Sequence, residues 1–123
     1  MRQNTKPESV WILKTTGEAV RAEDAPFTLY EDTGYELSLK WAKEHIANGC
    51  TIAELVRLPY GEMWMDEEGL FREERHLNGM ATAIYQSVMG GGNPIVGNVV
   101  LVLYPGHAME SNLNKVLGEL VRN

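Results

Sequence analysis

The sequence contains a single cysteine, no long hydrophobic run, and only 11 lysine and arginine residues against 17 aspartate and glutamate residues. One cysteine excludes an internal disulfide and fits a reducing cytoplasm. No apolar run approaches the roughly 20 residues of a membrane-spanning helix, and the N-terminus lacks the apolar core of a signal peptide. A net charge of −6 argues against binding to duplex nucleic acid or anionic membranes, because both need a basic surface. We therefore expect a soluble cytoplasmic protein with neither as a partner.

Recognisable catalytic and cofactor motifs are also missing. No Gly-x-Ser-x-Gly elbow exists, and no Gly-Lys-Ser or Gly-Lys-Thr accompanies the triple glycine Gly90–Gly92. These glycines follow a predicted helix, whereas a phosphate loop places its glycines before one, so a helix stop and a connection is the better interpretation. Cys50 also follows a predicted helix, whose negative end disfavours a thiolate nucleophile. The sequence thus predicts no cofactor and favours a binding protein over an enzyme.

The clearest feature that is present is the run Val99–Leu103, in which every residue is valine or leucine. A Gly-Asn pair precedes the run and a Pro-Gly pair follows it, so its length and boundaries predict a strand at about 97–104. Alternate side chains of a strand point to opposite faces, and both sets are apolar here. We therefore predict that this strand lies in the middle of a sheet, with other elements packed on both faces.

Periodicity predicts the remaining elements. Short apolar runs bounded by turn residues predict strands at residues 10–14, 18–21, 51–58 and 62–66, and residues 27–30 are compatible with an extended segment. Helical spacing of apolar residues predicts amphipathic helices at about 34–48, 79–89 and 111–121. Thr33 and Glu36 have capping-box spacing before the first helix, and Asn78 is a good N-cap for the second.

The order of these elements predicts an α+β fold, with a mostly antiparallel sheet packed by two to three helices. We find no repeat or linker, so residues 1–123 are expected to form one domain, with residues 1–9 flexible. If the helices cover one face of the sheet, the central strand needs cover on the other face too. A crossing helix or a second copy of the chain would supply it, and the second alternative predicts a homodimer.

Four segments resemble a known family in their order and spacing. They are Ile-Ala-Glu-Leu-Val-Arg-Leu (52–58), Met-Asp-Glu-Glu-Gly-Leu (65–70), Asn-Gly-Met-Ala-Thr (78–82) and Pro-Ile-Val-Gly-Asn-Val-Val (94–100). Over about residues 36–103 the chain is similar to the family called domain of unknown function 3846, small proteins common in phages, plasmids and actinobacteria. That family has no assigned activity, so no residue role follows from it. The resemblance implies a phage or mobile-element accessory protein in the cytoplasm of a bacterial host.

The leading functional prediction is a non-enzymatic protein that binds a small host molecule, such as a nucleotide-like signal, and so counters a host response. Polar and glycine residues that bracket the connection between the second helix and the central strand are the predicted ligand site. They are Asn78, Thr82, Gly91, Asn93 and Asn98. One alternative is an interaction module that binds a host protein.

A second alternative is a small metal-dependent hydrolase that uses Glu67, Glu68, Glu73 and His76. Glu73 and His76 have the Glu-x-x-His spacing of carboxylate di-metal sites, but those sites need two copies on facing helices and only one is present. Adjacent carboxylates in a turn also diverge. The sequence therefore favours a solvated hairpin tip here and predicts no metal site.

Overall fold

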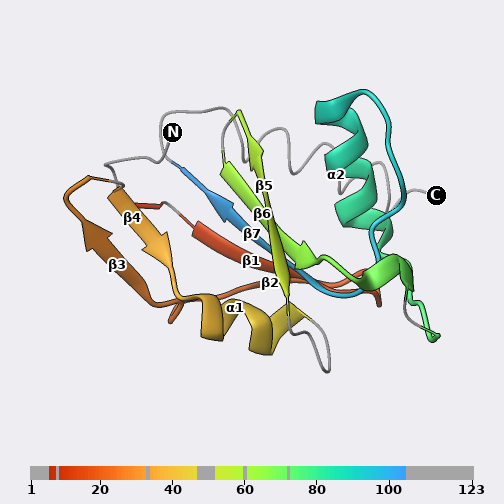
Figure 1. The fold of residues 1–123 in the computed structure, drawn as a ribbon, viewed down its shortest axis with the longest axis horizontal. Coiled ribbons are helices and arrows are strands. Elements are labelled where there is room, and N and C mark those ends of the chain that lie inside the picture. The colour runs from red at the N-terminus through yellow and green to blue at the C-terminus, as the bar shows by residue number, and fades with distance from the viewer. Residues whose placement is uncertain are drawn as a thin grey trace.

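The computed structural model describes residues 6–7, 9–32, 34–46, 52–59, 61–71 and 73–104. Strands β1–β7, helices α1 and α2 and one 3₁₀ helix, η1, follow one another in this part of the chain (Figure 1). Their bounds are β1 (Ser9–Leu13), β2 (Ala19–Arg21), β3 (Phe27–Tyr30), β4 (Gly34–Leu37), α1 (Leu39–Ile46), β5 (Ala53–Leu58), β6 (Gly61–Asp66), η1 (Gly69–Phe71), α2 (Gly79–Met89) and β7 (Val99–Leu103).

Strand β7 lies in the middle of a five-stranded sheet. The strand order is β2-β1-β7-β6-β5, and every pairing within it is antiparallel. Leu101, at the centre of β7, lies opposite Trp11 of β1 and Met63 of β6. The α+β class and the central strand predicted from the sequence are therefore confirmed. At roughly 1.5–3 kcal/mol per fully buried aliphatic side chain, β7 supplies much of the burial energy of the fold.

Side chains of β7 alternate between two hydrophobic cores on opposite faces of the sheet. Leu101 and its neighbours on one face pack with Met80, Ala81 and Ile84 of α2. Val100, Val102 and Tyr104 on the other face pack with Ala42 and Ile46 of α1. Figure 1 shows the two helices on opposite sides of the sheet. Each apolar face of the central strand thus packs against a different helix.

The hairpin of β3 and β4 completes the cover on the α1 side. These strands form a separate two-stranded sheet, and Phe27 and Leu37 contribute to the core on that face. The second face is therefore covered without a second copy of the chain. The physical reason for expecting a homodimer no longer holds, although the dimer itself stays a prediction.

Helix α2 has the boundaries that its end residues predict. The Oδ1 atom of Asn78 accepts the backbone N–H of Ala81 at 3.1 Å, which caps the first turn. Gly90 takes a left-handed conformation with φ of 75°, and its N–H donates to the carbonyl of Gln86. The predicted helix at 79–89 is confirmed, as is the glycine stop that follows it.

The first predicted helix, at 34–48, is wrong over residues 34–38, because α1 begins at Leu39. Residues 34–37 form β4, and Glu36 lies opposite Thr28 in the hairpin, so the capping-box spacing of Thr33 and Glu36 does not mark a helix start. The helix begins after Ser38, whose Oγ accepts the N–H of Trp41 at 3.3 Å. Pairing with β3 outweighs the local signal, because an amphipathic segment this short forms either element according to its partner. Thr33 and residues 47–48 lie outside the described residues.

Some smaller points concern segment ends. After β6 the chain turns into the short helix η1, which includes Leu70 and Phe71. Ser9 is buried and begins β1, so at least this residue of the predicted flexible stretch belongs to the sheet. The helix predicted at 111–121 lies outside the described residues. Among the helices that are described, none has the length and apolar content needed to cross a bilayer.

Candidate functional site

A cleft of about 520 Å³ lies at one end of the sheet. Because the strands are antiparallel, β1 and β6 end at the same edge at which β7 begins. Thr15 follows β1, Asp66 ends β6 and Asn98 precedes β7, and all three line the cleft. The last turn of α1 contributes Glu44 and His45. Segments that are distant in the sequence thus meet around one cavity.

The cleft is acidic. Four carboxylate side chains line it, namely Glu44, Asp66, Glu73 and Glu74, and among the described residues that line it there is no lysine or arginine. Asp66 is only 7% exposed, and its Oδ1 accepts the backbone N–H of Glu68 at 3.1 Å. A cleft lined by charges of one sign concentrates the electric field and attracts ions of the opposite sign. The geometry therefore favours a cationic ligand.

His45 enters this cleft in a fixed orientation. Its Nδ1 lies 2.8 Å from the backbone carbonyl oxygen of Trp41, and its ring stacks on the Trp41 indole with ring centroids 4.1 Å apart. A carbonyl oxygen only accepts, so Nδ1 is the donor in this contact, and the tautomer that makes it has Nε2 as its acceptor. A ring that is held in one tautomer and stacked on an aromatic neighbour is oriented before a ligand arrives.

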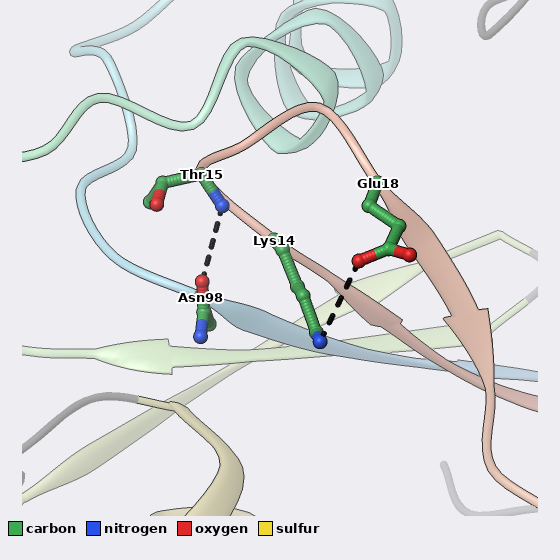
Figure 2. A network of polar contacts seen from close by, with 4 residues as sticks. All are labelled: Lys14, Thr15, Glu18 and Asn98. Atoms are coloured by element: carbon green, nitrogen blue, oxygen red, sulfur yellow. Dashed lines mark hydrogen bonds and ion pairs between the residues drawn. The ribbon is translucent and has the colours of Figure 1, made fainter.

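A hydrogen bond at the cleft joins the β1–β2 turn to the segment before β7 (Figure 2). The backbone N–H of Thr15 donates to Oδ1 of Asn98 at 3.1 Å. Lys14 extends instead toward Glu18, with its Nζ 3.6 Å from the carboxylate. Lys14 is thus paired across its own turn and is not among the residues that line the cleft.

The five predicted ligand residues do not surround one cavity. Asn98 lines the cleft, and Asn93 lines a second, smaller cavity. Asn78 is fully buried: its Nδ2 donates to the carbonyls of Leu13 at 2.8 Å and Gly97 at 2.9 Å.

The other two predicted ligand residues line neither of these cavities. Thr82 Oγ1 accepts the N–H of Ile95 at 2.8 Å. Gly91 follows α2 with φ of 143°. Asn78 and Thr82 therefore join α2 to the segment before β7, and their hydrogen bonds are those of a structural link.

The residues of the metal-site hypothesis are also divided. Glu73 and His76 line the acidic cleft, whereas Glu67 lines the second cavity. Within the described ranges, no three histidine, cysteine, aspartate or glutamate side chains are placed to hold a metal ion.

Sequence reasoning did not identify the residues that supply carboxylate and imidazole groups to the cleft from α1 and from the end of β6. Glu44, His45 and Asp66 are not among the predicted ligand residues. The spacing of Trp41 and His45, one helical turn apart, was the available signal that the imidazole is held in place. Their neighbours across the cleft come from residues 73–76, which no local pattern connects to α1. No family model, curated protein or solved structure matches this chain, so the family resemblance stays a prediction.

Proposed function

We propose that this protein binds a small organic cation, an amine or a guanidinium compound, in the acidic cleft. The observation that carries the proposal is the charge of the lining, with four carboxylates and no described lysine or arginine. Ammonium and guanidinium groups donate charge-assisted hydrogen bonds to carboxylates, and these are stronger than bonds between neutral groups. The cleft volume of about 520 Å³ also lies in the range of small-molecule sites.

His45 adds directional selectivity to this charge. Its Nε2 accepts one N–H from the ligand, because Nδ1 is already committed to the carbonyl of Trp41. A metal cation would need further ligands that converge with Nε2 on one point, and among the described residues no three histidine, cysteine, aspartate or glutamate side chains are placed to hold one. A ligand with several N–H donors therefore matches the cleft better than a simple ion does.

The same charges act against the phosphate groups of a nucleotide, because like charges at close range raise the free energy of the complex. A nucleotide-like ligand would have to enter with its base and leave its phosphates outside. The nucleotide version of the function, the counter-defence role and the mobile-element origin stay predictions. Binding of a small molecule is the part that the cleft supports.

Isothermal titration calorimetry with spermidine and agmatine tests the proposal, with AMP and citrate as anionic comparators. We expect both cations to bind, and binding to weaken as salt is raised because exposed charges are screened. Neither anion is expected to bind in the cleft.

The double variant Glu73→Gln and Glu74→Gln removes two cleft carboxylates and should weaken spermidine binding about tenfold or more. Glu23→Gln with Glu31→Gln makes the same change in net charge at exposed positions that do not line the cleft. This matched control should bind spermidine with an affinity close to that of the unchanged protein. If the two double variants lost equal affinity for spermidine, net charge alone would attract the cation, and the proposal would be wrong.

A further inference from the structure

Strand β5 forms one edge of the main sheet. It has 6 residues, Ala53–Leu58, and it pairs with β6 on one side. Among the described strands, none pairs with its other side. An open edge presents a row of backbone N–H and C=O groups on which a further strand can form.

A second cavity, of about 230 Å³, adjoins this edge on the α2 face of the sheet. Glu54 and Val56 of β5 point to that face, together with Met65 of β6, and all three line the cavity. Tyr85 of α2 and Ile95 line it from the other side. A strand added to β5 would place every second side chain on this same face, beside the cavity.

The cavity combines an apolar lining with carboxylates. Val56, Met65 and Ile95 supply apolar surface, and Glu54 and Glu67 supply negative charge, while no lysine or arginine is found among its described lining residues. Leu70 also lines it and is 38% exposed. Apolar side chains left in water next to a groove are typical of interaction sites.

Phe71, the next residue along the chain, is 87% exposed, more than any other large apolar side chain among the described residues. It extends the apolar surface that Leu70 begins. The edge strand, the cavity and Leu70 form the candidate surface for a partner, and Phe71 is the next residue of η1.

We propose that the β5 edge and the second cavity are a docking site for an extended segment of a protein partner. The segment carries an apolar side chain flanked, on the same face, by lysine or arginine. Main-chain hydrogen bonds to β5 supply affinity, and the apolar pocket with its carboxylates supplies specificity. A second copy of this chain is disfavoured as the occupant, because it brings its own Glu54 and a net charge of −6 to the same place.

NMR titration with synthetic peptides tests this site in the full chain. The probe is a heptapeptide with Lys, Leu and Lys on one face of the strand and Thr at the other four positions. We expect shifts of the amide signals of Glu54, Leu55 and Val56 and of the neighbouring Tyr85, with saturation. An otherwise identical peptide with Glu in place of Lys, and one whose backbone is N-methylated at alternate residues, should each bind at least about tenfold more weakly.

Protein variants separate this site from general attraction to an acidic surface. Glu54→Lys with Glu67→Lys should weaken binding of the lysine peptide about tenfold or more, and Glu18→Lys with Glu23→Lys, at the opposite edge, should leave it nearly unchanged. Equal binding of the N-methylated peptide would overturn strand addition. Equal effects of the two charge reversals, no shifts in β5, or self-association of the chain through β5 would overturn the proposed partner.

Discussion

Replacing Gly61 by alanine is expected to lower the free energy of unfolding by about 3 kcal/mol. Gly61 begins β6, is buried, and lies opposite Leu103 of the central strand. A Cβ atom at this position would overlap the carbonyl oxygen of Val102. The obstacle is backbone, so no side-chain rotation relieves it and the β6–β7 ladder has to open. Urea-induced unfolding, followed by circular dichroism, measures the loss.

Gly79→Ala is the matched control for this prediction. A Cβ atom at Gly79 meets nothing within 4 Å, and the residue is the first of α2. Alanine has the higher helix propensity, so this variant should be neutral or more stable by up to about 1 kcal/mol. A loss of less than about 1 kcal/mol in Gly61→Ala would contradict the close packing of β6 against the central strand.

Replacing Asn78 by aspartate is expected to destabilise the protein by about 3 kcal/mol or more, although aspartate is an equally good N-cap on an isolated helix. The side-chain amide of Asn78 donates to the carbonyls of Leu13 and Gly97, while its oxygen caps α2 at Ala81. Aspartate keeps the cap but loses both donors, and it places a buried charge against two carbonyl oxygens. Each carbonyl left without a partner costs about 1–3 kcal/mol.

Comparison of Asn78→Asp with Asn78→Ala separates the two roles of this side chain. If the amide links matter as argued, aspartate is at least as harmful as alanine when both are unfolded in urea at neutral pH. If Asn78 acted only as a helix cap, the Asn78→Asp variant would be nearly as stable as the unchanged protein. Stability of Asn78→Asp within about 0.5 kcal/mol of the unchanged protein would therefore show that the bonds to Leu13 and Gly97 contribute little.

The parts of the fold that were predictable are those that local chemistry determines. The five consecutive valine and leucine residues at 99–103 form a buried strand, because both of their faces are apolar and each packs against an apolar layer. The ends of α2 are defined by the side chain of Asn78 and by the left-handed backbone conformation of Gly90. The first helix shows the limit. Its amphipathic pattern continues into residues 34–37, and only pairing with β3 makes these residues a strand.

The cleft was beyond local reasoning because it joins segments that no short pattern relates. Thr15, His45, Asp66 and His76 come from four separate parts of the chain and meet because β1, β6 and β7 have their relevant ends at one edge. The ligand prediction includes Asn98, which lines the cleft, and it stays a prediction. It also chose Asn78, whose burial and three hydrogen bonds follow only from the packed structure.

An NMR titration of the isotope-labelled protein with spermidine tests the central claim most directly. We predict saturable changes in the ring signals of His45 and in the backbone amides of Glu44, Glu74 and Asn98, with little change around β2 and the β3–β4 hairpin. Absence of change at His45, or small unsaturated shifts spread over all the exposed carboxylates, would show that the cleft does not bind an organic cation.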